Sequence, residues 1–412
     1  MKNKIIKRDE LLLLVLSFGV SGDSLLPSVL FTKNILTINS LKLIQVIVIT
    51  LFFILALFKK KKIAIKRKDV RCYSLYFNWL IVSAALSVLQ AAIYHNQDVF
   101  VGIIATSIYV VFLSYYIFLS FSFSSESIVT IFKILGVANV IAIFLSFLTM
   151  PECLFGSYEL DSSRGFRIRA GNVIWVYLAM IFWEERFLKS LRVKYLFISA
   201  ICFFSVSLLL TRQFIIISLI MITLAVWIEG GKKIKFLFLI ILIMGIGYVM
   251  SLDIIKDVVE MTANQHEDIK SYDDIRSFSA RYYLFEGQTD IITCFFGNGV
   301  WSVNNSQYGY KMASLGLMPA DVGYLGFYYY FGVFGVIPII LIMIKSLKNT
   351  ANSRNKYVFF FFVGFALSSF VGGSVTYPSH LYIWILMIYY STIKIKIEQR
   401  NINNIVTKRN GC

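Results

Sequence analysis

The sequence is poor in charge and in proline. Charged residues make up 15% of the chain and hydrophobic residues 58%, with a mean hydropathy of +0.73. Soluble domains carry roughly 25% charged residues and cannot hide this much apolar surface from water. Only 5 prolines stand against 37 Phe and 24 Tyr, which excludes a disordered or collagen-like chain. The composition therefore predicts a polytopic membrane protein.

Cysteine is also scarce, and its spacing carries no motif. The 5 cysteines lie at positions 72, 153, 202, 294 and 412, and none forms a CxxC pair. This scatter indicates neither a metal site nor a redox pair. Cys153 and Cys294 are both predicted near the outer face, where the compartment permits a disulfide without requiring one.

Long apolar runs are abundant. A helix that crosses a bilayer needs about 17 to 25 predominantly apolar residues. About twelve such runs predict an all-α, polytopic integral membrane protein. The sixth, eighth and twelfth runs are short, so eleven spans or a re-entrant segment is the main alternative. The runs are 11–30, 41–58, 74–94, 99–121, 128–149, 171–184, 195–211, 214–228, 235–252, 321–344, 357–375 and 381–393.

The predicted spans are unevenly distributed along the chain. Nine fall in an N-terminal membrane region, 1–252, and three in a C-terminal region, 321–412, which ends in a cytoplasmic tail. Residues 253–320 between them are predicted to form one large outer loop, with helices over 253–270 and 281–293. A loop of this length with its own structure is more often functional than passive. No half-length repeat is present, which disfavours a carrier built from repeated halves.

The net charge of +17 is explained by topology. If the amino terminus is cytoplasmic, most of the 40 Lys and Arg residues fall in inside segments, as the positive-inside rule requires. The densest run, Lys59 to Lys62 with further bases up to Arg71, predicts a stop-transfer signal and a contact with anionic membrane lipids. Both termini are therefore predicted inside, the first span is predicted to be an uncleaved signal anchor, and no nucleic-acid partner is expected.

Against this trend, one arginine cluster lies on the predicted outer face. Arg164, Arg167 and Arg169 precede the sixth span. Lipid headgroups are one partner for such a cluster. The other is a diphosphate, since the planar and permanently charged guanidinium matches phosphate oxygens.

Two more outer arginines stand alone. Arg212 lies between Thr211 and Gln213 in a very short connection, where it is either a snorkelling end-cap or a cation facing a cavity. Arg281 is expected to open a helix of the outer loop, at an end that already favours anions. A structural salt bridge to Glu286 is the alternative for Arg281.

The order of these features resembles the Wzy-type O-antigen polymerase and O-antigen ligase superfamily. Its usual marks are SR or TR between spans, R…fGxG in the large outer loop, and hNxyLxxlxxxGxxG at the loop exit. The resemblance covers about residues 160–345. Ligases typically carry His at the loop exit, whereas this chain has Asp321, which favours a polymerase. The matching residues are Thr211-Arg212, Arg281, Phe296-Gly297-Asn298-Gly299, and Asp321-Val322-Gly323-Tyr324-Leu325 with Gly332 and Gly335.

The resemblance implies a metal-independent, inverting GT-C-like glycosyltransferase with no cofactor, in the bacterial cytoplasmic (inner) membrane. Its substrate would be undecaprenyl-diphosphate-linked oligosaccharide, whose repeat units it joins into O-antigen or capsular-type polysaccharide. A chain-length regulator and a flippase of the same pathway would be its protein partners. An O-antigen ligase is the alternative enzyme, and a flippase or exporter of lipid-linked oligosaccharide is the alternative from another class.

The implied reaction is attack by an acceptor hydroxyl on the donor's anomeric carbon. Arg212 and Arg281 would stabilise the diphosphate leaving group, and Asp321 is the candidate base, with helix N-capping as its alternative role. His95 and His380 are expected in interfacial turns, and Asp23 either ends a helix or is a buried functional acid. Substrate binding is expected of Arg164, Arg167, Arg169, Gly297, Gly299, Trp301 and Tyr324, the last two through sugar contacts.

Overall fold

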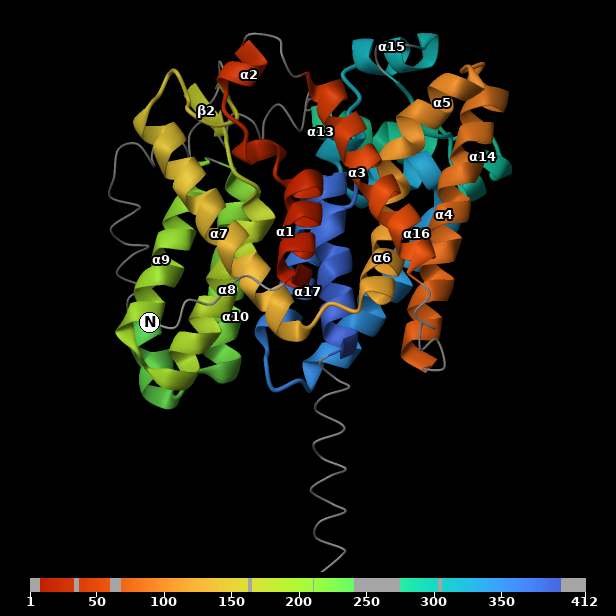
Figure 1. Cartoon of the computed structure of the whole chain (residues 1–412). Helices are drawn as coiled ribbons and strands as arrows, with labels where there is room; N and C mark the ends of the chain where they lie inside the picture. The colour runs from red at the N-terminus through yellow and green to blue at the C-terminus, as the bar shows by residue number, and fades with distance from the viewer. Residues whose placement is uncertain are drawn as a thin grey trace, which may run out of the picture.

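The structure is a computed structural model, and it describes residues 8–32, 37–59, 68–161, 165–209, 211–240, 275–302 and 306–393. Its helices run between an upper and a lower face, as oriented in Figure 1. Five described helices are long and apolar enough to cross a membrane, and three shorter apolar helices accompany them. The protein is a helical membrane protein. The five long spans are Ser40–Phe58, Val70–His95, Val99–Phe121, Ser125–Leu148 and Tyr324–Ala351.

The N-terminal part of the chain crosses between the two faces several times. The connections after α1, α4 and α7 lie on the upper face, and the connection after α6 lies on the lower face (Figure 1). The elements are α1 (Arg8–Ser21), η1 (Asp23–Leu25), α2 (Val29–Thr32), α3 (Ile38–Phe58), α4 (Lys68–His95), α5 (Val99–Thr106), η2 (Ser107–Leu113), α6 (Ser114–Phe121) and α7 (Ser125–Leu148).

The remaining elements include a short sheet and a set of short helices at the upper face. They are β1 (Ser157–Asp161), β2 (Gly165–Arg169), α8 (Val173–Ser190), α9 (Val193–Leu208), α10 (Arg212–Glu229), α13 (Ile275–Arg281), η3 (Tyr282–Glu286), α14 (Ile291–Phe296), α15 (Gln307–Ser314), η4 (Pro319–Asp321), α16 (Tyr324–Ala351) and α17 (Tyr357–Val371). Helical residues also occupy 232–240 and 378–393.

The described chain is nearly all helical, as predicted, and one short β-hairpin is its departure from an all-α fold. β1 and β2 pair antiparallel, with Ser157 opposite Arg169. The second strand, Phe166-Arg167-Ile168-Arg169, alternates apolar and charged residues, and this period of two is typical of a strand. The sequence therefore contained a signal for this strand, in the same residues that form the arginine cluster.

The predicted single helix over 281–293 is wrong, because the structure has two helical segments there with a break between them. Helical residues end at Glu286, and α14 begins after Asp290, whose side chain accepts a hydrogen bond from the Thr293 N–H at 2.7 Å. The break begins at Gly287, where an added Cβ would lie 2.6 Å from the Tyr329 ring, so this turn packs tightly on α16. The predicted helix 253–270 and most of the span 235–252 lie outside the described residues.

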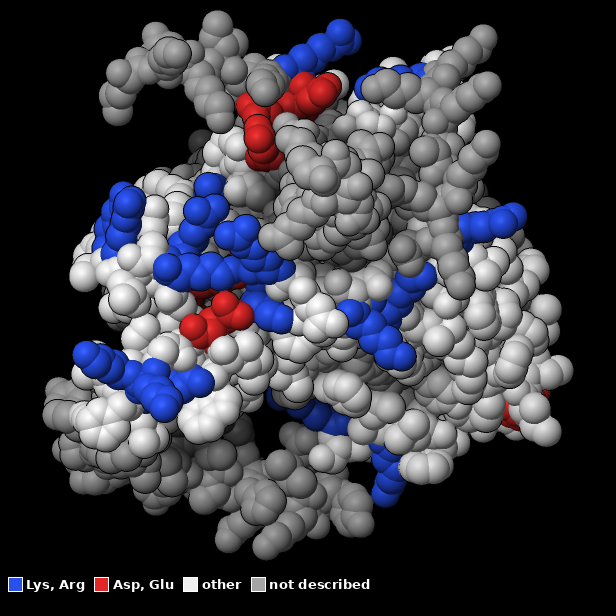
Figure 2. Space-filling model, turned by 90° about the horizontal axis from the view of Figure 1, so that it is seen from below, with Lys and Arg blue, Asp and Glu red and all other residues white. Residues whose placement is uncertain are grey.

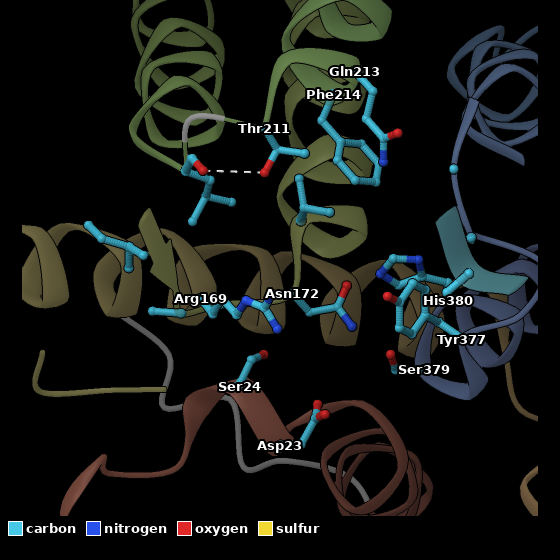
Figure 3. A pocket seen from close by; sticks show the side chains of 18 of the residues that line it. Asp23, Ser24, Arg169, Asn172, Thr211, Gln213, Phe214, Tyr377, Ser379 and His380 are labelled. Carbon is cyan, nitrogen blue, oxygen red and sulfur yellow. Dashed lines mark hydrogen bonds between the residues drawn. The ribbon is translucent and has the colours of Figure 1, made fainter. Parts of the chain in front are cut away.

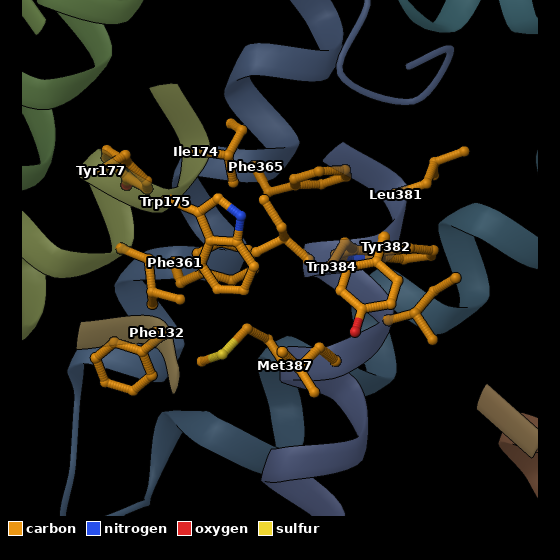
Figure 4. Packing of buried hydrophobic residues seen from close by; sticks show 14 of the residues in the cluster. Phe132, Ile174, Trp175, Tyr177, Phe361, Phe365, Leu381, Tyr382, Trp384 and Met387 are labelled. Atoms are coloured by element: carbon orange, nitrogen blue, oxygen red, sulfur yellow. The ribbon is translucent and has the colours of Figure 1, made fainter. Parts of the chain in front are cut away.

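The core lies where α8, α17 and helix 378–393 meet. Helix α8 packs against α7, α9, α10 and α17. Residues 381–390 are all buried, and the Trp384 ring stacks on Phe365 with centroids 5.5 Å apart (Figure 4). A helix that is apolar all round is buried on every side by other helices. These elements are therefore the interior of the bundle, and the exposed apolar residues lie on the helices around them.

Basic side chains gather on the lower face (Figure 2). They come from the connection between α8 and α9, from the end of α10 onward, and from the connection between α16 and α17. Acidic residues are fewer there, and Glu185 is used structurally, because it accepts hydrogen bonds from the backbone N–H groups of Lys356 and Tyr357. The basic residues include Arg186, Lys189, Arg192, Lys194, Lys232, Lys233, Lys235, Lys348, Arg354 and Lys356.

Candidate functional site

A cavity of about 480 Å³ opens at the upper end of the bundle (Figure 3). Six segments that are far apart in sequence line it: η1, the end of β2 with the start of α8, the connection between α9 and α10, α13, η4, and residues 372–380. The lining thus brings together segments from the first connection to the last helix of the described chain. This makes the cavity the candidate site.

Local hydrogen bonds fix the wall formed by β2 and α8. Gly171 has a φ of +71° and donates its N–H to the Ser24 carbonyl at 3.1 Å, which ties the hairpin to η1. Asn172 caps α8, because its side chain accepts a hydrogen bond from the Ile174 N–H at 3.1 Å. The Asn172 N–H in turn donates to the side chain of Asn139 on α7. These bonds hold Arg169 at the edge of the cavity.

Glycines allow the opposite wall to close. Gly323 has a φ of +53°, and a Cβ added there would lie 1.9 Å from the Ser369 carbonyl oxygen. A Cβ at Gly372 would lie 2.4 Å from the side-chain oxygen of Gln213, and one at Gly373 would lie 2.5 Å from the Ala320 carbonyl. The start of α16, the end of α17 and the start of α10 can meet only because these positions have no side chain.

Three helix N-termini open onto the cavity. Asn172 and Thr211 are the N-cap residues of α8 and α10, and both line the cavity. Ser379 and His380, in the first turn of helix 378–393, line it as well. The N-terminus of a helix carries a partial positive charge and backbone N–H groups without helical partners. The backbone of these three helices therefore already favours binding of an anion in the cavity, without any contribution from side chains.

Charged side chains of both signs face the same space. Arg169 and Arg276 supply positive charge, and Asp23 and Asp321 supply carboxyl groups. Burial raises the pKa of Asp23, although a hydrogen bond from the Ser24 backbone acts in the opposite direction. Burial lowers the pKa of His380 to about 4. Burial thus disfavours the charged form of both side chains.

Two buried polar atoms of the cavity wall have no hydrogen-bond partner among the described residues: the Ser24 hydroxyl and the His380 Nδ1. Buried polar atoms are nearly always paired, so such atoms call for an explanation.

The predicted arginines separate into two sets. Arg169 lines the cavity, and Arg212 is the first residue of α10, between Thr211 and Gln213, which both line it. The side chains of Arg167 and Arg212, and all of Arg164, lie outside the described residues. The expectation that Arg281 opens a helix is wrong: it lies in the last turn of α13 and pairs with Glu286 at 2.7 Å. Arg276, five residues earlier on the same helix, lines the cavity instead.

Asp321 lies where a catalytic group is expected. It is the last residue of η4, it is exposed, and it lines the cavity. The N-cap of α16 is Gly323, so the alternative role of Asp321 as the cap of that helix is not observed. Tyr324 follows, and its ring packs edge-on against Phe370 with centroids 5.0 Å apart, outside the cavity lining.

Gly297, Gly299 and Trp301 do not line the cavity. An added Cβ would lie 2.4 Å from the Tyr330 carbonyl at Gly297 and 2.2 Å from the Ser87 carbonyl at Gly299, so no sugar fits against either glycine. Trp301 is buried in an aromatic cluster within the loop. Their surroundings indicate that these three residues dock the loop onto α4 and α16, and substrate binding by them stays a prediction.

Sequence reasoning assigned no site role to Ser24, Arg276 or His380, and it left Asp23 open between a helix end and a buried functional acid. Asp23 and Ser24 belong to the first connection, and His380 to the last, both beyond the region of the family resemblance. His380 was expected in an interfacial turn, and no spacing in the sequence connects it with Arg169. Arg276 carried a weak signal as a second arginine in an acidic loop segment.

Comparisons with known proteins do not identify the chain. No family model matches it, and a search of curated proteins finds no match. The function is therefore inferred from the chemistry of the cavity and from the motifs that meet there.

Proposed function

We propose that this protein is a glycosyltransferase that polymerises undecaprenyl-diphosphate-linked oligosaccharide repeat units at the outer face of the bacterial cytoplasmic membrane. One observation carries the proposal. The arginine cluster at Arg169, the Thr211-Arg212-Gln213 connection and Asp321 at the loop exit come from separate motifs, yet all three border one cavity. If the motifs matched the family by chance, they would have no reason to lie together in space.

The cavity supports a diphosphate headgroup as the ligand. Three helix N-termini and the side chains of Arg169 and Arg276 give it anion-binding character. Negative charge develops on the diphosphate as its bond to the sugar breaks. Fixed cations aimed at that charge stabilise the transition state more than the ground state, which is the condition for catalysis. No metal is needed for this role.

The proposed orientation puts the cavity outside. The lower face, rich in Lys and Arg, is then cytoplasmic, as the positive-inside rule requires (Figure 2). An enzyme on the outer face has no nucleotide sugar available, so its donor must arrive on a lipid. Twelve spans, cytoplasmic termini and an outer loop over 253–320 belong to this proposal, as do a chain-length regulator and a flippase as partners.

The orientation predicts which face reacts with a membrane-impermeant thiol reagent. In a background whose 5 native cysteines are replaced, Ser314→Cys on α15 is expected to react from outside. Lys232→Cys, beyond the end of α10, is expected to react only after the membrane is permeabilised. Both positions are exposed. Labelling of position 232 in intact cells would put the cavity in the cytoplasm and overturn the proposal.

Deletion of the gene tests the reaction itself. A polymerase defect leaves single repeat units on the cell surface, because export and attachment continue without elongation. A ligase defect leaves full-length polymer on the lipid carrier and none on the surface. A flippase defect leaves single units facing inward. Gel analysis of surface and lipid-linked glycan separates the three, and only the first pattern agrees with the proposal.

A flippase is less well supported by the distribution of charge. Moving a charged headgroup across the bilayer requires polar groups along a path through the bundle. Residues 381–390 and α8 instead fill the centre with tightly packed apolar side chains (Figure 4). The polar groups of the cavity remain near one face.

A further inference from the structure

His380 occupies one side of the cavity, with Arg169 on the other side and Asn172 between them in the view of Figure 3. It lies in the first turn of helix 378–393. Its ring meets Phe214 edge-on, with centroids 6.3 Å apart at 89°, and lies against Tyr377 at 5.3 Å. Two aromatic neighbours from different elements hold the imidazole in place.

The Nδ1 atom of this ring is buried and has no hydrogen-bond partner among the described residues. His95, the other described histidine, contrasts with it: its Nε2 bonds to the Asn298 side chain at 3.1 Å, and its ring stacks on Tyr308 at 3.7 Å. A neutral imidazole has one nitrogen that accepts a hydrogen bond. The two described histidines therefore differ in hydrogen bonding and in place, since only His380 lines the cavity.

We propose that His380 is the general base that accepts the proton of the attacking sugar hydroxyl. This inference rests on the proposed transferase function. As the acceptor oxygen forms its bond to the anomeric carbon, the bond from that carbon to the diphosphate oxygen breaks and its electron pair stays on the diphosphate. The hydroxyl proton passes to His380 and leaves the imidazolium for water as the product departs. Atoms and charge balance without any further reactant.

The other titratable groups of the cavity are less suited to this step. The Asp23 carboxyl already accepts a hydrogen bond from the Ser24 backbone, and burial raises its pKa. Asp321 is exposed, so water solvates its carboxylate at the rim. His380 is kept neutral by burial, and a bound diphosphate would favour the imidazolium that forms. Arg169 and Arg276 face the same space and oppose that charge, so the base is expected to act only when the diphosphate is bound.

The test uses the full-length protein in lipid nanodiscs with a lipid-diphosphate-linked oligosaccharide. His380→Gln keeps a polar side chain of similar length but cannot accept the proton. We expect turnover to fall by about a hundredfold or more, with little change in KM. His380→Ala is expected to lose as much and to regain turnover when imidazole is added. His95→Gln, the matched control outside the cavity, is expected to retain turnover.

The outcomes distinguish this inference from the proposed function. If the wild type elongates the oligosaccharide and His380→Gln does so at a similar rate, His380 is not the base, although the function stands. A loss in both His380 variants with no imidazole rescue assigns His380 a structural role and also overturns the inference. If the wild type binds the lipid-linked substrate and transfers no sugar, the proposed function itself fails. Equal levels of folded protein on size-exclusion chromatography are required of every variant compared.

Discussion

Replacing Arg169 and Arg276 together with alanine is expected to stop chain elongation while the protein still reaches the membrane. Both side chains line the cavity and come from different elements, β2 and α13. Each loss of a charge-assisted hydrogen bond to the diphosphate is worth about 1.5–3 kcal/mol, or roughly ten- to more than a hundredfold in rate. The double variant is expected to exceed either single one. Glycan gels and in vitro turnover measure the effect.

Lysine at the same positions is the sharper probe of the mechanism. It keeps the charge but loses the planar fork that binds two phosphate oxygens at once. A diphosphate clamp is therefore expected to suffer from Arg169→Lys and Arg276→Lys, whereas a contact with lipid headgroups would tolerate both. Wild-type chain length in both lysine variants would contradict the clamp and direct attention to Arg212.

Arg281→Ala is the matched control for Arg276→Ala. The two arginines lie on the same short helix, but Arg281 pairs with Glu286 and does not line the cavity. Both arginines are exposed, so neither substitution is expected to disturb folding much. We expect Arg281→Ala to retain most of the turnover. An equal loss in both variants would mean that the cavity does not define the site.

Gly297→Ala is expected to destabilise the protein severely. Gly297 has φ 83° and ψ 177°, a conformation essentially restricted to glycine, and an added Cβ would lie 2.4 Å from the Tyr330 carbonyl. Strain alone costs about 1–3 kcal/mol, and the clash adds to it. The loop would no longer dock through the hydrogen bond from the Asn298 N–H to the Tyr329 carbonyl, 2.8 Å long. A lower midpoint of thermal unfolding in detergent measures this.

Gly231→Ala provides the control. An added Cβ there meets nothing within 4 Å, so its midpoint is expected to match that of the wild type. If Gly297 contacted the sugar instead, Gly297→Ala would have normal stability and weaker substrate binding. That result would restore the substrate-binding interpretation of this motif.

The sequence predicted the place of some arginines in the site better than that of others. Arg169 was predicted as a ligand contact because a cation cluster on an outer face needs an anionic partner, and that reasoning used only local sequence. Arg281 was ranked above Arg276 because it matched a motif. The structure reverses their order, since the pitch of α13 decides which of the two side chains borders the cavity. Sequence position alone did not reveal where the helix would begin.

The glycines show a different limit. Their presence in a turn could be predicted, because Phe296-Gly297-Asn298-Gly299 has two residues that adopt positive φ without cost. The residues that pack against these glycines could not be predicted from the sequence. The Ser87 carbonyl is about two hundred residues away in sequence, and only the packing of the loop on α4 brings it to Gly299.

The sequence by itself determined that this is a helical membrane protein and which segments carry the arginines. Bilayer thickness and the cost of unpaired backbone groups in lipid set the length and composition of spanning helices, so a linear reading finds them. Only the tertiary structure decided that α8 and residues 381–390 are the interior of the bundle, and that Asp23, Arg276 and His380 share one cavity. In lipid, an apolar helix can face the bilayer or other helices, and hydrophobicity does not distinguish the two. The packing of the helices decides which of them are interior, and it thereby decides which residues meet in the cavity.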